Sequence, residues 1–283
     1  MRNILLIGSV CLFAVSLLFS QPLFELEGDF IHGGLIRGHT LENISSVSFD
    51  GEELTVSDST FLFGFRLNDP YQHTLIAVLE SGEKLQVNLT IADYNQGEID
   101  SITVVPEMID PPKSPELIKR LEEEYYIKRG ARKALVITKF PYFSVIQRPV
   151  VGGRITTNFG AKRVYNGWKE SVHTGVDIAR GTGINVRAMA DGMVTLIGDF
   201  YYSGYFVFVD HGLGLSSEYF HLSKQKVTES DLVTRNQILG EVGSTGRSTG
   251  PHLHWQSNWF DKKLNPLFLI DEISEVREYK WVE

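Results

Sequence analysis

The segment Ser248 to Gln256 reads "STGPHLHWQ" and places two histidines, His252 and His254, on either side of one leucine. In a β-strand, residues i and i+2 point to the same face, so both imidazoles project into the same space about 7 Å apart. Two imidazoles on one face can bind a metal ion, because neutral histidine is a common metal ligand. A pair of half-buried core histidines gives the same pattern, so further ligands must decide between the two interpretations.

Candidate ligands lie upstream in "VHTGVDIA", where His173 and Asp177 are four residues apart with Gly175 between them. On a helix this spacing brings both side chains to one face. The β-branched neighbours and the interior glycine favour a bend that leads into a strand instead. Alone, the pattern is also typical of an aspartate that caps a turn.

A third segment, "SSEYFHLS", contains Tyr219 and His221, which we expect to share one face of a strand. Two histidines and one aspartate form a sound three-ligand set for catalytic zinc, which leaves the fourth position to water. Five of the eight histidines lie between His173 and His254, so the chemistry is predicted to concentrate there. The remaining three lie among predicted turns and are expected to have surface or hydrogen-bonding roles: His32, His39 and His73.

Taken in order, three motifs resemble the M23 (LytM- or lysostaphin-like) zinc metallopeptidases, which cut peptide cross-links in bacterial peptidoglycan: "HTGVD", "YFHLS" and "GSTGRSTGPHLHW". This resemblance covers residues 140–283. The segments "LEGDFIHGGLIRGHT" and "STFLFGF" also resemble, more loosely, the N-terminal β-domain that precedes M23 domains in some Gram-negative envelope proteins.

Carried over residue by residue, the resemblance implies that His173, Asp177 and His254 bind one Zn²⁺ and that His221 and His252 are the unligated catalytic pair. Zinc lowers the pKa of its bound water to about 7 and polarises the scissile carbonyl. A neutral histidine can take the proton of that water, and a protonated one can stabilise the developing oxyanion.

Several residues near these motifs are interpreted as having no part in metal binding or catalysis. Ser244 and Ser248 lie in a glycine-rich loop and read as turn residues rather than nucleophiles, and His211 matches a turn histidine of the family. The chain departs from the family pattern at four positions, which leaves loop shape and substrate choice open: Gly181, Asn185, Tyr205 and Gln256.

The elements that must position these residues are predicted to be mainly β. Short alternating runs separated by turns at Asp50-Gly51 and Ser81-Gly82 predict a small β-sandwich over residues 21–105. A proline-rich linker and a connecting helix are expected over 106–139, with Ser114 as N-cap and a solvated, charged face. Glycine-punctuated strands over 140–283 predict an antiparallel β-sheet peptidase domain.

Composition and the first residues indicate where the protein acts. The formal charge of −8 lacks the clustered basic residues that phosphate binding needs, so nucleic acid is excluded as a partner and recognition is expected to rely on groove shape and hydrogen bonding. Residues 1–20 read as a signal peptide with cleavage after Ser20, which predicts export to the periplasm or cell envelope; an uncleaved membrane anchor is the alternative. The single cysteine, Cys11, lies within this segment.

These observations predict a zinc-dependent endopeptidase that acts on the stem peptides of peptidoglycan during cell-wall remodelling, with an envelope regulator or an amidase as a further partner. Two alternatives stay open: a non-enzymatic LytM-type activator of cell-wall amidases, and a zinc amidase at the sugar–peptide junction. The presence of His173, Asp177 and His254 favours an enzyme, because a pure activator has no chemical need for metal ligands.

Overall fold

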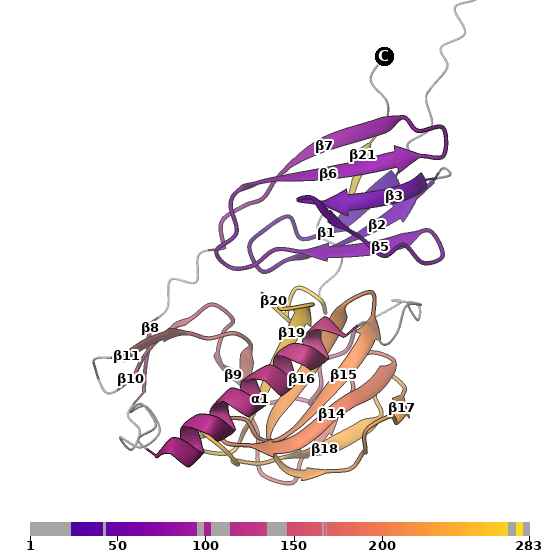
Figure 1. The fold of residues 1–283 in the computed structure, drawn as a ribbon. Coiled ribbons are helices and arrows are strands. Elements are labelled where there is room, and N and C mark those ends of the chain that lie inside the picture. The colour runs from indigo at the N-terminus through magenta and orange to yellow at the C-terminus, as the bar shows by residue number, and fades with distance from the viewer. Residues whose placement is uncertain are drawn as a thin grey trace, which may run out of the picture.

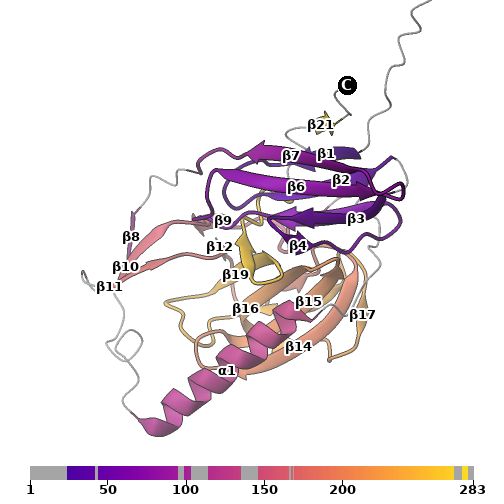
Figure 2. The same cartoon turned by 45° about the horizontal axis from the view of Figure 1, so that its top comes forward.

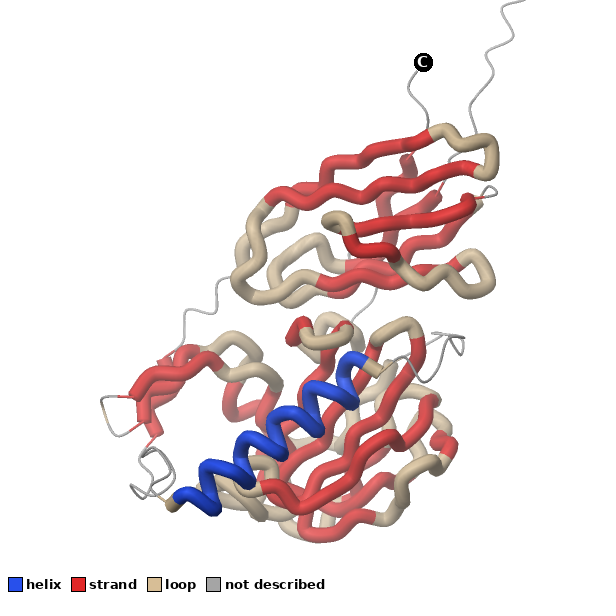
Figure 3. Tube along the Cα trace, in the orientation of Figure 1, coloured by secondary structure: helices blue, strands red, loops and turns tan. Residues whose placement is uncertain are grey.

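Strands dominate the chain, and the computed structural model arranges them in two groups, one above the other in Figure 1. The structure describes residues 24–41, 44–94, 99–102, 114–134, 146–165, 167, 169–270 and 276–279. The predicted signal peptide and most of the predicted linker outside its helix lie outside these residues. The predicted fold class, mainly β with antiparallel sheets, is confirmed. Figure 3 shows how strands dominate the described chain. In the part of the chain that is described, no helix has both the length and the apolar character needed to cross a membrane.

The N-terminal group is a β-sandwich of two four-stranded sheets, as predicted (Figure 2). One sheet has the strand order β21-β1-β2-β5 and the other has the order β4-β3-β6-β7. The strands of the first sheet are β1 (Phe24–Gly28), β2 (Leu35–Thr40), β5 (Thr60–Gly64) and β21 (Val276–Tyr279). The strands of the second sheet are β3 (Ile44–Phe49), β4 (Glu52–Glu53), β6 (Gln72–Leu79) and β7 (Lys84–Thr90).

A cluster of phenylalanine rings joins these two sheets. The Phe49 ring of β3 stacks on the Phe63 ring of β5 at a centroid distance of 4.5 Å and meets Phe65 edge-on at 5.8 Å. All three side chains are buried. Because burying one such ring stabilises the folded state by about 1.5–3 kcal/mol, the cluster is a main source of the sandwich's cohesion.

Two tight turns occur at the positions predicted from the sequence, and they fix the register of the strands that they join. Asp50 and Gly51, between β3 and β4, both have positive φ angles, 51° and 83°, as a type I′ hairpin turn requires. At the turn between β6 and β7, the Gly82 N–H donates to the Leu79 carbonyl at 2.9 Å. Both predicted turns are confirmed.

The C-terminal group is built on a ten-stranded antiparallel sheet, as predicted. Its main path is β17-β14-β15-β16-β19-β12-β9, and β13, β18 and β20 pair beside this path. The strands are β9 (Arg154–Thr157), β12 (Val176–Ala179), β13 (Asn185–Arg187), β14 (Gly192–Phe200), β15 (Gly204–Gly212), β16 (Leu215–Gln225), β17 (Leu232–Val233), β18 (Ile238–Val242), β19 (His252–Trp259) and β20 (Lys262–Leu264).

Strands and side chains connect the two groups. The small sheet β8-β10-β11 consists of β8 (Ile99–Ile102), β10 (Lys162–Tyr165) and β11 (Lys169–Val172). In it, β8 follows the sandwich in sequence and pairs in parallel with β10 of the C-terminal half. Strand β21, at the other end of the chain, returns to pair with β1. An ion pair between Arg66 and Asp261, at 3.0 Å, adds a direct contact between the groups.

Helix α1 (Pro115–Lys133) runs diagonally across β14, β15 and β16 (Figure 1). It begins as predicted, with the Ser114 hydroxyl accepting the N–H of Leu117 at 3.1 Å. The prediction that its charges form a solvated face is wrong on the side that meets the sheet. There Arg132 donates to both carboxylate oxygens of the fully buried Glu218 on β16, at 2.6 and 3.0 Å. Because no residue of α1 is buried, polar side chains rather than an apolar stripe attach this helix.

Candidate metal centre

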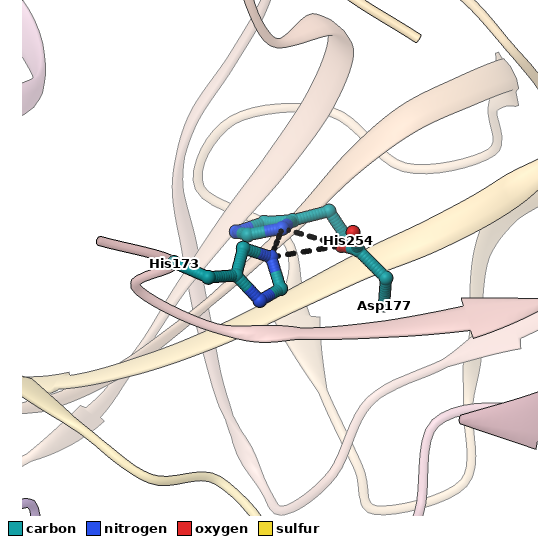
Figure 4. A group of neighbouring side chains, drawn as sticks. All are labelled: His173, Asp177 and His254. Atoms are coloured by element: carbon teal, nitrogen blue, oxygen red, sulfur yellow. Dashed lines mark hydrogen bonds and ion pairs between the residues drawn. The ribbon is translucent and has the colours of Figure 1, made fainter. Parts of the chain in front are cut away.

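Three side chains that the sequence predicts as ligands converge on one face of the large sheet: His173, Asp177 and His254 (Figure 4). Nδ1 of His254 lies 2.8 Å from Oδ1 of Asp177 and 2.9 Å from Nε2 of His173. The His173 nitrogen lies 3.1 Å from the same carboxylate oxygen. All three residues are buried, so the fold holds two imidazoles and one carboxylate around a common point.

Strand pairing explains why these residues meet. Asp177 of β12 is directly opposite His254 of β19 in the antiparallel register, and directly opposite residues project from the same face of a sheet. His173 lies in the predicted bend that leads into β12. Gly175 in this bend is needed for close approach, because a Cβ atom there would lie 2.8 Å from His254 Nε2 and 2.5 Å from the Trp255 carbonyl oxygen.

The hydrogen bonds of the site fit a metal ion at this point. Nδ1 of His173 donates to the Asn158 carbonyl at 2.9 Å, so Nε2 of the neutral ring carries a lone pair. That lone pair faces the Asp177 carboxylate, which is also an acceptor. Two acceptors this close repel each other unless a cation or a proton lies between them. A tetrahedron with Zn–N bonds of about 2.0–2.1 Å has edges of roughly 3.3–3.4 Å. The three observed separations, 2.8 to 3.1 Å, approach that size.

The electrostatics of these three residues also fit a metal site. Burial by itself raises the pKa of Asp177, but the contacts with His173 and His254 outweigh it and hold the pKa well below its usual range. Burial lowers the pKa of His254 to about 4. Near neutral pH the carboxyl is therefore ionised and the imidazole neutral, which are the protonation states that metal ligands require.

The two predicted catalytic histidines lie beside this centre. The ring centroids of His221 and His252 are 4.7 Å apart, and Nε2 of His252 is 3.8 Å from Oδ1 of Asp177. Nδ1 of each ring donates to a backbone carbonyl at 2.8 Å, that of Thr245 for His221 and that of Gly250 for His252. In the neutral rings this leaves Nε2 as the proton acceptor of both histidines.

The expectation that Tyr219 shares a strand face with His221 is wrong. Tyr219 points into the core, where its hydroxyl accepts the N–H of Met189 at 2.9 Å. His221 has a positive φ of 62°, next to a register irregularity in β16, and this left-handed conformation breaks the alternation of side chains. The residue on the site face at this level is Phe220, whose ring stacks on His254 at 5.1 Å and 13°.

A cleft of about 250 Å³ contains all five predicted site residues. Its lining also includes Arg163 of β10 and the segments 171–174, 202–203 and 247–249. Arg163 donates a hydrogen bond to Oδ2 of Asp177. Sequence reasoning missed this residue because β10 has no motif of its own and reaches the cleft only through its place in the small sheet.

Lys128 of α1 is a second residue that the sequence does not single out. Its ammonium group lies 4.4 Å from the ring centroid of Phe220 and donates to the hydroxyl of Ser203. The carbonyl of Ser203 in turn accepts the N–H of His221 at 2.9 Å. Through these contacts the helix supports both the ring that covers His254 and the backbone that carries His221.

Comparison with known proteins gives a family match at this site. A family model described as Peptidase family M23 matches residues 171–266, which include all five site residues. A crystal structure from Pseudomonas aeruginosa that is assigned to peptidase M23 is 27% identical in sequence, with a TM-score of 0.66. It covers 85% of this chain and 94% of its own, so the similarity extends beyond the cleft to the sandwich.

Curated relatives match the C-terminal half. The DD-carboxypeptidase/endopeptidase Mpg of Neisseria meningitidis is 39% identical over 121 residues, and the peptidoglycan DD-endopeptidase ShyA of Vibrio cholerae is 34% identical over 134 residues. These matches cover 42% and 47% of this chain. They cover 27% and 30% of the relatives, so the chain spans less than a third of the length of either one.

Proposed function

Because residues 171–266 form a domain of peptidase family M23, we propose that the protein is a zinc-dependent endopeptidase that hydrolyses the peptide cross-links of bacterial peptidoglycan. The observation that carries this proposal is the convergence of His173, Asp177 and His254 beside two further histidines in one cleft. The names of Mpg and ShyA support it, since both include endopeptidase activity and that of ShyA includes peptidoglycan.

The three converging residues would hold the metal: His173 through Nε2, His254 through Nδ1 and Asp177 through Oδ1. When bound there, zinc supplies a Lewis acid for the scissile carbonyl and an acidified water molecule. Arg163 has a supporting role, because its hydrogen bond to Oδ2 of Asp177 leaves Oδ1 as the oxygen that faces the two imidazoles.

His221 and His252 supply the proton transfers. Burial and the neighbouring histidines His252 and His254 lower the pKa of His221 to about 3, so its ring is neutral at pH 7. With Nδ1–H tied to a backbone carbonyl, Nε2 of either ring can accept the proton of the attacking water. The ring that has become charged can then donate to the leaving amine. Proton transfer of this kind contributes about 10²- to 10⁴-fold to the rate of a reaction.

The cellular location, the domain boundaries and the partners of the protein are proposed from its sequence. We propose that residues 1–20 direct export to the periplasm or cell envelope, where peptidoglycan lies. We also propose that the chain divides into a sandwich over 21–105, a linker over 106–139 and the peptidase over 140–283, with two exchanges between them: β21 pairs with β1 of the sandwich, and β8 pairs with β10 of the peptidase. An envelope regulator or an amidase is the proposed partner. The alternative function, activation of amidases without catalysis, is disfavoured because it requires no metal-binding residues.

Digestion of purified peptidoglycan by the zinc-loaded protein tests the proposal, with the products identified by mass. Uncross-linked muropeptides are the expected products. Free stem peptides would instead identify an amidase at the sugar–peptide junction. No product from the protein alone, together with faster digestion when a cell-wall amidase is added, would replace the proposal with the activator function.

A further inference from the structure

The charge of the catalytic cleft is opposite in sign to that of the whole protein. Its lining includes the guanidinium groups of Arg163 and Arg247 but one carboxylate, that of Asp177. Zinc, when bound, would add two further positive charges. The chain as a whole has a formal charge of −8. The cleft is therefore a local positive region of an acidic protein, and anionic groups are drawn to it rather than to the surface in general.

Arg247 is, besides Arg163, the second arginine of the cleft lining. Its guanidinium carbon lies 4.5 Å from the ring centroid of Tyr202, a distance at which a cation is attracted to the ring face. The backbone N–H of Arg247 donates to the carbonyl of Tyr202 at 2.9 Å. Both side chains are partly buried and both line the cleft. Arg247 and Tyr202 thus form a paired unit.

The backbone beneath this pair is tightly packed. Gly246 has a positive φ of 68°, and a Cβ atom there would lie 2.3 Å from the backbone nitrogen of Gly204 and 2.7 Å from the Tyr202 carbonyl. The hydroxyl of Thr245 donates to the Leu222 carbonyl at 2.8 Å. The loop that carries Arg247 is therefore held against the segment that carries Tyr202, which reduces the entropy lost when a ligand binds between them.

We propose that Arg247, supported by Tyr202, forms a subsite for a free carboxylate of the stem peptide, close to the scissile bond. This inference rests on the proposed function and names the chemical feature that the enzyme selects in its substrate. A guanidinium is suited to this role because its planar fork matches a carboxylate with two parallel hydrogen bonds. Arg247 and Tyr202 line the same cleft as His173, Asp177 and His254, so a peptide bound at the metal centre shares the cleft with this pair.

Cross-linked stem peptides offer such a carboxylate at two places. One is on the residue whose amine forms the cross-link, where that residue is a diamino dicarboxylic acid, and the other is at the free end of the peptide. Converting either group to a carboxamide removes the charge and preserves the shape. Muropeptide dimers with neither, one or both groups amidated therefore identify which carboxylate the subsite binds.

The test compares wild type with Arg247→Gln and Arg247→Lys on these dimers. We expect wild type to cleave the unmodified dimer with a kcat/KM roughly tenfold to a hundredfold above that of one singly amidated dimer, because hydrogen bonds to charged groups are the stronger kind. Arg247→Gln should lose the preference for the unmodified dimer and should cleave the singly amidated dimer as fast as wild type does. Arg247→Lys should recover part of it. The exposed Arg154 on β9 gives a matched control, and Arg154→Gln should behave as wild type.

Two cleavage results overturn the inference: a wild type that cleaves acid and amide dimers equally, or a loss in Arg247→Gln that is the same for both. Calorimetric binding of the same dimers to the zinc-loaded proteins separates the inference from the proposed function. If wild type cleaves no dimer but binds the acid form more tightly in an Arg247-dependent way, the endopeptidase proposal fails and the subsite stands. If neither cleavage nor binding depends on Arg247, the subsite fails.

Discussion

Replacing Arg132 by methionine is predicted to destabilise the fold, because it removes the main partner of the Glu218 carboxylate inside the protein. Glu218 is fully buried, and Arg132, 14% exposed, donates to both of its oxygens. Removing one partner of a buried ion pair costs about 3–5 kcal/mol. Lys263 remains 3.6 Å from the carboxylate, and the Gln256 amide still donates to it at 2.8 Å. We therefore expect a loss of about 3 kcal/mol, the lower end of this range.

The loss of unfolding free energy in Arg132→Met depends on pH, because it depends on whether the Glu218 carboxyl is ionised. Burial raises its pKa, but the positive charges of Arg132 and Lys263 outweigh burial and hold the pKa below its usual value. A carboxyl with a lower pKa in the folded state stabilises the fold above the unfolded pKa of about 4.3, and this contribution disappears as pH falls through the folded pKa. The difference between wild type and Arg132→Met is therefore full at pH 7 and shrinks below about pH 4.

Urea unfolding of the metal-free proteins, followed by tryptophan fluorescence, measures this difference. A loss of about 3 kcal/mol corresponds to a midpoint lower by roughly 1 M urea for a slope of about 3 kcal/mol/M. Lys119→Met on the same helix is the control, because Lys119 is 78% exposed and its contact with Glu123, at 3.7 Å, is a surface pair of little energetic consequence. Equal midpoints for wild type and Arg132→Met at pH 7, or a deficit undiminished in acid, would refute the reasoning.

Three further changes have defined outcomes. Gly175→Ala places a Cβ atom 2.8 Å from His254 Nε2 and is expected to lower the zinc content measured by metal analysis; full occupancy would contradict this. Lys128→Met removes the cation beside Phe220 and should lower kcat severalfold at unchanged zinc content, with Lys128→Arg restoring part of it; an unaltered kcat would show that the helix does not support the site. Phe49→Ala should lower the free energy of unfolding by about 3–5 kcal/mol in the same urea assay, because it removes a buried ring that stacks on Phe63. An unchanged free energy of unfolding would contradict this.

Local signals in the sequence are enough for much of the fold. The Asp50-Gly51 and Ser81-Gly82 turns occur where their φ preferences demand, and Ser114 caps the helix as its hydroxyl chemistry predicts. Long-range pairing has no local signal. That is why the parallel contact of β8 with β10 and the return of β21 to β1 were not foreseen.

The limits of prediction at the site have the same origin. His173, Asp177 and His254 could be predicted because the motifs that contain them resemble those of the M23 metallopeptidases, and strand register then brings two of them face to face. The orientation of His221 could not be predicted, since its left-handed conformation depends on a local irregularity in β16. Arg163 approaches from a strand whose position depends on tertiary pairing.

The same limit applies to charge. Counting charges over the whole chain predicts recognition by shape and hydrogen bonding alone, but a total does not reveal how charges are distributed. The folded chain gathers Arg163 and Arg247 into one cleft with a single carboxylate. The docked face of α1 is a similar case, because Arg132 and Lys128 look like solvated residues until their partners on the sheet are known.

The central claim is that three residues hold the metal while two neighbouring histidines perform the chemistry, and zinc content measured together with peptidoglycan cleavage tests it most directly. In one series, wild type should hold one zinc and cleave, His254→Ala should lose both zinc and activity, and His221→Ala should keep zinc but lose activity. His39→Ala, an exposed histidine of the sandwich, should match wild type. Full activity in His254→Ala, or loss of zinc in His221→Ala, would contradict this division of roles.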